Sequence, residues 1–302
     1  MQSAKQSLHA IALKLAQAMA FSLMYAMIKL AGEVPIGEVV FYRGFFALIP
    51  LFVWTFFTVG PVRAIKTKRP AYHVVRAVLG TTSMFSSFLA VQLLPLVTVT
   101  AFNFVQPIFA VILAALFLHE KVGKYRWGAV IVGFGGVLLM LEPHGGLQAL
   151  LTFGSSKGVT YALVSAFLTA VVVVWIRQMS ASERCEAIVF YFMTACATMG
   201  AIVMLWDYAP IGWNSVFWLV LCGLVGGVGQ LLMTYSYRYA EPSLLAPFDY
   251  TQMIWAMLLG WFVLGEMPVS MVLWGAGVVI VSGSIIAWRE HRLRLELPQP
   301  MT

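Results

Sequence analysis

The sequence predicts an all-α membrane protein with ten transmembrane helices, and three observations lead to this fold class. Of the 302 residues, 61% are hydrophobic and only 10% are charged, whereas a soluble domain has about 45–50% apolar and about 25% charged residues. The apolar residues form ten continuous runs, each close to the roughly 20 residues that a helix needs to cross a bilayer. The runs do not alternate between apolar and polar residues, which favours helices over the strands of a barrel.

The ten expected helices follow one another with short connections, and most runs end at a break that contains glycine or proline. The first run follows Lys5, as the apolar part of a signal peptide would. It is too long for a signal peptide and continues to Lys29, so we expect a retained helix. The expected helices cover residues 8–31, 36–58, 72–91, 95–118, 125–141, 158–176, 188–206, 214–237, 244–264 and 269–288.

The lysine and arginine residues between the runs predict the orientation of the helices. Ten crossings place both termini on one side, and 14 Lys and Arg residues fall on that side, against at most three on the other. Short loops rich in these residues stay in the cytoplasm, so we expect an N-in, C-in topology with residues 289–302 as a cytoplasmic tail. The net charge of +7 is then a property of cytoplasmic loops, and we expect no nucleic-acid partner.

The chain contains an internal repeat at an offset of 146 residues. The matching positions are Phe102 with Phe248, Asn103 with Asp249, Gln106 with Gln252, Ala110 with Ala256, Glu120 with Glu266 and Gly80 with Gly226. We therefore divide the chain into two five-helix repeats, 8–141 and 158–288. Five is an odd number, so the second repeat enters the membrane from the opposite side. Secondary transporters use such inverted-topology repeats to alternate access to a site near the midplane, so the repeat predicts a transporter.

Four sequence segments resemble the EamA branch of the drug/metabolite transporter superfamily. They are QPIF at 106–109, LHEK at 118–121, GFGGV at 133–137 and FYRG at 41–44. The resemblance covers about residues 10–288, and it implies a multi-pass carrier of the bacterial cytoplasmic membrane. Within the branch the chain looks most like uptake carriers for S-adenosylmethionine or riboflavin, and amino-acid exporters share the fold. The second repeat departs from the first at Met253, which stands where the first has Pro107.

The resemblance also implies which helices line the substrate cavity. These are the first, third, fourth, sixth, eighth and ninth of the expected helices, whereas the fifth and tenth are peripheral.

Ionisable residues inside the runs are candidates for function, because a charge near the bilayer centre is costly. Asp249 is the only acidic residue well inside a run, and Lys14 and Arg76 lie at a similar depth from the cytoplasmic face. We expect Asp249 to couple transport to protons or to a cationic substrate group. The alternative for Asp249 is a structural ion pair with Lys14 or Arg76. The two basic side chains are also long enough to reach the lipid headgroups. Arg43 is a substrate-binding candidate, with an outward reach or a bridge to Glu33 or Glu38 as alternatives.

Amide and aromatic side chains near these charges suit a flat, partly apolar organic substrate. Interhelical hydrogen bonds and core packing are the alternatives for each of them. The candidate substrate-binding residues are Asn103, Gln106, Asp249, Gln252, Tyr25, Arg43, Phe102, Phe248, Tyr250 and Trp255.

No sequence pattern indicates a cofactor, a metal site or catalysis. Cys185, Cys196 and Cys222 lack the spacing of a zinc site, and the histidines lie near helix ends without a nucleophile beside them. We expect a small-molecule substrate, a lipid bilayer around the protein, and a monomer or homodimer. The alternatives to a secondary transporter are an intramembrane lipid-modifying enzyme, a lipid flippase and a passive pore.

Overall fold

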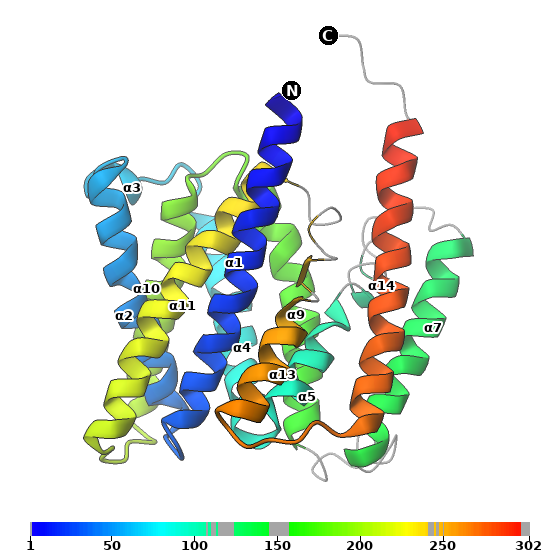
Figure 1. The fold of residues 1–302 in the computed structure, drawn as a ribbon. Helices are drawn as coiled ribbons and strands as arrows, with labels where there is room; N and C mark the ends of the chain where they lie inside the picture. Colours follow the sequence, from blue (N-terminus) through cyan, green and yellow to red (C-terminus); the bar gives the residue numbers. More distant parts are fainter. Residues whose placement is uncertain are drawn as a thin grey trace.

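The computed structural model of the chain describes residues 2–106, 108–109, 113, 124–144, 157–240, 245, 248–249 and 251–296. All regular structure in these residues is helical (Figure 1). The helices are α1 (Gln2–Leu30), α2 (Ile36–Phe57), α3 (Pro61–Ala64), α4 (Pro70–Leu93), α5 (Leu96–Asn103), α7 (Lys124–Leu141), α9 (Lys157–Met179), α10 (Cys185–Met204), α11 (Trp213–Tyr239), α13 (Thr251–Phe262) and α14 (Ser270–Glu296), with a 3-10 turn, η1 (Glu142–His144).

Six of the described helices are long and apolar enough to cross a membrane, namely α1, α2, α4, α9, α10 and α11. Shorter apolar stretches lie in α7, over Ile131–Met140, and in α14, over Ser270–Ser282. The prediction of an all-helical, multi-pass membrane protein is therefore confirmed. The number of ten crossings and the orientation stay predictions. The start of α1 and the end of α14 lie at the same end of the molecule (Figure 1).

Glycine and proline set several helix ends, as the sequence indicated. The φ angles of Gly32 and Gly60 are 79° and 80°, in the left-handed region that glycine adopts at little cost, and these residues follow α1 and α2. Proline occupies the first turn of α3 and of α4, where its missing N–H would have had no helical partner. The α1–α2 and α2–α3 connections are short for this reason.

Two helix ends differ from the expected ranges. The run 95–118 was expected as one helix, but α5 ends at Asn103, and a turn follows in which Phe104 N–H bonds to Ala101 O at 3.1 Å. The last expected helix ended at 288, but α14 continues to Glu296. The residues after 288 are mostly arginine, glutamate and leucine, which favour helix even outside an apolar run.

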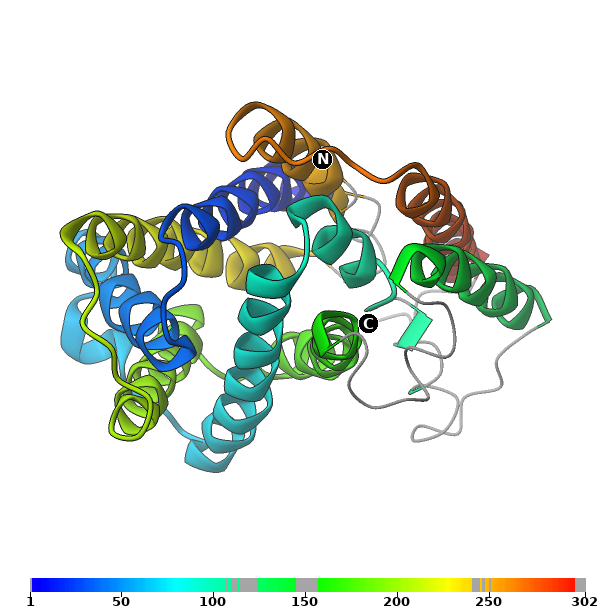
Figure 2. The same cartoon turned by 90° about the horizontal axis from the view of Figure 1, so that it is seen from below.

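The helices pack in pairs that join the two expected repeats. Helix α1 packs against α11, α4 against α9, α2 against α10, α5 against α13 and α7 against α14. Seen along the helices, the first four pairs form one group and the α7–α14 pair lies at its side (Figure 2).

The α7–α14 pair is held by reciprocal glycine contacts. A Cβ atom built on Gly136 would lie 2.8 Å from Gly275 O, and one built on Gly275 would lie 2.5 Å from Gly136 O. Both distances are too short for a side chain, so the two backbones approach as closely as only glycine allows.

Replacing Gly275 by leucine is expected to separate α7 from α14. Overpacking of this kind costs about 1–3 kcal/mol, so the Tm of the detergent-purified protein should fall by about 5 °C. The matched control is Gly277→Leu on the same helix, because a Cβ atom on Gly277 meets nothing within 4 Å. Equal Tm values for the two variants would show that the glycine contact does not hold the pair.

Candidate functional site

A cavity lies between the paired helices and takes its wall from both parts of the chain. It has a volume of about 140 Å³, and α1, α2, α4, α5, α9, α10 and α11 contribute to it together with residues near the start of α13. Among the described residues, none from α7 or α14 lines it. These two helices correspond to the fifth and tenth expected helices, for which the resemblance implied peripheral positions.

Helical spacing brings the lining residues of α1 and of α4 onto one face of each helix. Successive lining positions are mostly three or four residues apart, which is one helical turn. They are Lys14, Gln17, Phe21, Met24 and Tyr25 on α1, and Arg76, Gly80, Ser83, Met84, Ser87 and Phe88 on α4.

Lys14 is a buried cation whose charge is fully paired. Its Nζ atom lies 2.7 Å from Asp249 Oδ1 and donates a hydrogen bond of 2.8 Å to Tyr237 OH. The Lys14 side chain is 2% exposed and that of Asp249 is 30% exposed, so Lys14 does not reach out to lipid headgroups. The ion pair joins α1 to the segment that precedes α13, and it explains how a charge is tolerated at this depth.

Arg43 is a buried cation without an acidic partner among the described residues. Its Nη2 donates to Gly226 O at 2.9 Å, and its Nε and Nη1 point to the sulfur atoms of Met24 and Met193 at 3.0 Å. Thioether sulfur is a weak acceptor, so the contacts orient the guanidinium group without neutralising it. The bridge to Glu38 that the sequence left open is not formed.

Arg76 is a second buried cation that has no acidic partner in the described part of the chain. Its guanidinium lies 3.7 Å from the centroid of the Phe192 ring, a cation–π contact. Its Nε and Nη1 atoms have no hydrogen-bond partner, although the side chain is only 2% exposed. Arg76 therefore does not reach the headgroups either.

Two glycines make room for the two arginines. A Cβ atom on Gly80 would overlap Arg76 Nη1, and a Cβ atom on Gly226 would overlap Arg43 Nε. Gly80 and Gly226 are the pair that the sequence repeat aligns. Each guanidinium group therefore lies in a recess that an alanine would fill.

Uncharged polar groups form the other part of the wall. Tyr25 OH shares a 3.0 Å hydrogen bond with Ser87 Oγ, and Ser83 Oγ shares one of 2.9 Å with Thr169 Oγ1. These hydroxyls offer donors and acceptors to a small polar molecule beside the aromatic rings of the wall.

The structure places the residues that the sequence singled out in three groups. Those in the cavity wall are Lys14, Tyr25, Arg43, Arg76, Asn103, Gln106, Asp249 and Gln252. Those elsewhere are Phe102, which is fully buried in the core, and Phe248 and Trp255, which are partly buried and do not line this cavity. Tyr250 lies outside the described residues, as do Pro107 and Glu120.

Sequence reasoning did not single out several wall residues. Tyr237, the hydroxyl partner of Lys14, and Phe192, the ring under Arg76, are aromatic residues in apolar runs and look like core residues. Ser83 and Ser87 carried a usable signal, because they lie two and three turns after Arg76 on the same face of α4.

At the end of the molecule opposite the termini, Glu266 ties three segments together. Its Oε1 atom lies 2.7 Å from Lys29 Nζ at the end of α1. Its Oε2 atom accepts a hydrogen bond of 2.7 Å from Leu96 N–H at the start of α5. The α13–α14 connection is thus fastened to two elements of the first expected repeat, and we call this contact the Glu266 latch.

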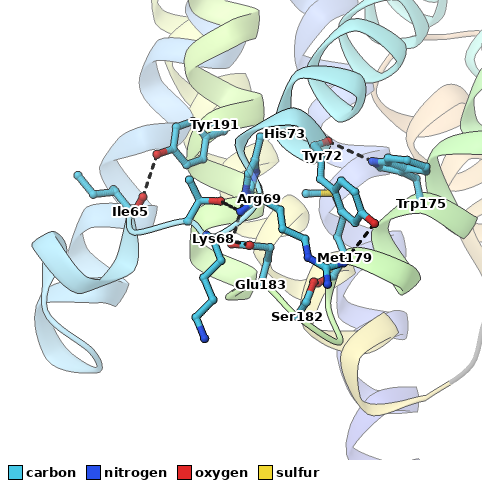
Figure 3. A network of polar contacts seen from close by, with 11 residues as sticks. Ile65, Lys68, Arg69, Tyr72, His73, Trp175, Met179, Ser182, Glu183 and Tyr191 are labelled. Atoms are coloured by element: carbon cyan, nitrogen blue, oxygen red, sulfur yellow. Dashed lines mark hydrogen bonds and ion pairs between the residues drawn. The ribbon is translucent and has the colours of Figure 1, made fainter.

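A polar cluster outside the cavity fastens two connections at the end where α1 begins (Figure 3). Glu183, between α9 and α10, accepts a hydrogen bond of 3.0 Å from Lys68 N–H and lies 3.5 Å from His73 Nε2. Tyr191 OH donates to Ile65 O at 3.0 Å. Burial would raise the pKa of Glu183, but its hydrogen bonds outweigh burial and lower this pKa below its usual value. The carboxylate is therefore charged at neutral pH, and it holds the α3–α4 connection against the α9–α10 connection.

Comparison with protein families matches the chain twice along its length. Residues 8–142 and residues 156–288 both match the EamA-like transporter family. The chain belongs to this family.

Relatives of the transporter are named for several different substrates. It is 26% identical over 260 residues to the S-adenosylmethionine uptake transporter of Rickettsia felis, covering 84% of each chain. It is 28% identical over 268 residues to the pseudopaline exporter CntI of Pseudomonas aeruginosa, covering 87% of this chain and 90% of that one. It is 26% identical over 246 residues to the riboflavin transporter of Vibrio cholerae, covering 79% of each.

A solved crystal structure shares the fold of the transporter, with a TM-score of 0.66 and 17% sequence identity over 94% of this chain and 98% of that chain. The family and the named relatives are transporters and not enzymes. The prediction of a transporter is confirmed over that of an intramembrane enzyme.

Proposed function

We propose that the protein is a secondary transporter of the bacterial cytoplasmic membrane that moves a small organic metabolite by alternating access. The substrate class is that of amino acids, nucleoside-like compounds or vitamin-like compounds such as S-adenosylmethionine or riboflavin. The two halves are the five-helix repeats 8–141 and 158–288, inserted in opposite orientations with both termini in the cytoplasm.

The observation that carries this proposal is the composition of the cavity wall. Lys14 belongs to the first half and Asp249 to the second, and the two form an ion pair in the wall. A cavity between two repeats is where transporters of this kind bind their substrates. Aromatic rings beside a few polar groups suit an organic metabolite better than a bare ion.

The pairing of the helices supports the two-fold relation of the halves. In chain order, the first repeat contributes α1, α2, α4, α5 and α7, and the second contributes α9, α10, α11, α13 and α14. If the two sets are exchanged in this order, the α2–α10, α5–α13 and α7–α14 pairs map onto themselves. The same exchange maps α1–α11 onto α9–α4. All five pairs are found, which is the pattern that an inverted repeat predicts.

Counterflow in proteoliposomes tests the proposal. Vesicles loaded with unlabelled S-adenosylmethionine, riboflavin or an amino-acid mixture should accumulate the matching labelled compound from outside, saturably and without chemical change. A passive pore would equilibrate the label without saturation, and a flippase would move labelled phospholipid instead. Either result would replace the proposal.

Cysteine labelling is expected to confirm the topology. Lys66 and Lys157 are both exposed, whereas the three native cysteines are free and buried and give a low background. With an impermeant maleimide on whole cells, Lys157→Cys should react and Lys66→Cys should react only after permeabilisation. Reaction of both from outside would refute the ten-helix topology.

A further inference from the structure

Within the described residues, the cavity wall carries three positive side chains and one negative side chain. Its ionisable side chains among the described residues are Lys14, Arg43, Arg76, Asp249 and the two tyrosines Tyr25 and Tyr237. Asp249 pairs with Lys14. In the part of the chain that the structure describes, neither arginine has an acidic partner, so two positive charges remain unpaired there.

Both arginines line the cavity and pack against the same helix, α10. Adjacent residues of α10 support them, since Phe192 lies under Arg76 and Met193 contacts Arg43. Two nitrogen atoms of Arg76, Nε and Nη1, have no hydrogen-bond partner among the described residues. An unpaired buried charge is strongly unfavourable unless a partner arrives.

We propose that Arg43 and Arg76 form a subsite for an oxyanion of the substrate, a carboxylate or a phosphate. The inference deepens the proposed function, because it states which chemical group the transported metabolite must carry. Guanidinium groups offer planar pairs of donors that match both oxyanions, and the glycine recesses fix the position of these donors. A neutral metabolite such as riboflavin would leave both charges uncompensated, so the inference narrows the proposed substrates to compounds that carry an oxyanion.

The subsite accounts for three features together. It explains why Arg43 and Arg76 lie in the wall without an acidic partner among the described residues. It explains why a glycine backs each guanidinium group, because a Cβ atom on Gly80 or Gly226 would push the group out of position. It also explains why the wall has few other charges, since Lys14 and Asp249 neutralise each other.

The test measures the Tm of the detergent-purified protein at constant ionic strength in sodium chloride, with sodium acetate, sodium phosphate or neutral acetamide added. Acetate, phosphate or both should raise the Tm by about 2–4 °C at saturating concentration, and acetamide should not. Which anion acts distinguishes a carboxylate subsite from a phosphate subsite. An equal shift with acetamide, or no shift with either anion, would overturn the proposal.

Three variants test whether the anion-dependent rise in Tm comes from Arg76. Arg76→Met should remove the anion-dependent shift and should raise the Tm of the empty protein, because it deletes an unpaired buried charge. Gly80→Ala keeps the charge, moves the guanidinium group and should weaken anion binding about tenfold. Arg63→Met, at an exposed position, is the matched control and should behave like the wild type. An unchanged anion shift in both Arg76→Met and Gly80→Ala would contradict the subsite.

The counterflow assay separates this inference from the proposed function. If labelled S-adenosylmethionine exchanges and its methyl ester competes equally well, transport stands and the oxyanion subsite is wrong. If no compound exchanges but the Arg76-dependent anion shift is present, the anion subsite stands and the proposed substrate classes are wrong.

Discussion

The Asp249→Asn variant is expected to lose gradient-driven accumulation of the transported metabolite while it keeps exchange. The carboxylate pairs with Lys14 between the two halves, so it is placed to exchange this partner for a proton or a substrate cation during the cycle. A pH gradient of one unit can support at most about tenfold accumulation per coupled proton. The Asp249→Asn variant should show no accumulation driven by the pH gradient, and its counterflow at fixed pH should persist.

Asparagine leaves the buried Lys14 without its counter-ion, so lower stability must be separated from lost coupling. The Lys14→Met/Asp249→Asn double variant removes both charges and should recover the Tm that the single Asp249→Asn variant loses, but it should not recover accumulation. The rate of gradient-driven accumulation and the rate of counterflow are measured across pH in one liposome preparation. Normal gradient-driven uptake by Asp249→Asn would end the coupling hypothesis.

Glu266→Gln is expected to release the latch at the end opposite the termini. The ion pair with Lys29 is partly exposed, with side chains 16% and 21% exposed, and contributes about 0–1 kcal/mol. The hydrogen bond from Leu96 N–H to a charged acceptor contributes about 1.5–3 kcal/mol, of which a neutral amide keeps part. In the proposed alternating-access cycle, loss of these contacts shifts the equilibrium toward the state open at this end by about tenfold.

A Ser87→Cys reporter in the cavity wall measures this shift. Modification from the outside by an impermeant thiol reagent should be about tenfold faster when Glu266→Gln is added, in step with the equilibrium shift. Glu33→Gln is the control, because Glu33 is an exposed glutamate at the same end, and it should leave the rate unchanged. Equal rates for Glu266 and Glu33 variants would show that the latch does not hold this end closed.

The fold class was predictable because a bilayer imposes a simple pattern on the sequence. Continuous apolar runs mark helices, and glycine and proline mark their ends, as Gly32, Gly60 and Pro70 show. Helix ends without such markers were not predictable. The charged residues after 288 continue α14 because helix propensity does not depend on the membrane, and the break after Asn103 arises from local hydrogen bonding.

The charges of the site could be found from their depth, but their partners could not. Depth placed Lys14, Arg76 and Asp249 in one layer, and the structure pairs Asp249 with Lys14 and leaves Arg76 on an aromatic ring. The choice between the two cations depends on which faces of α1 and α4 turn toward residue 249. The packing of the helices determines these orientations, and a single sequence does not contain that information.

The two glycine recesses are filled from different directions. Arg76 comes from the turn before Gly80 on the same helix, whereas Arg43 crosses from α2 to Gly226 on α11. If the halves exchange conformations during transport, the backbone of each half adopts the shape of the other. Each guanidinium group, however, stays attached to its own helix. Symmetry then no longer requires the two end states of such a cycle to have equal free energy. An unloaded carrier of this kind favours one of its two orientations. The charge of the bound ligand then determines how much the populations of the two orientations change.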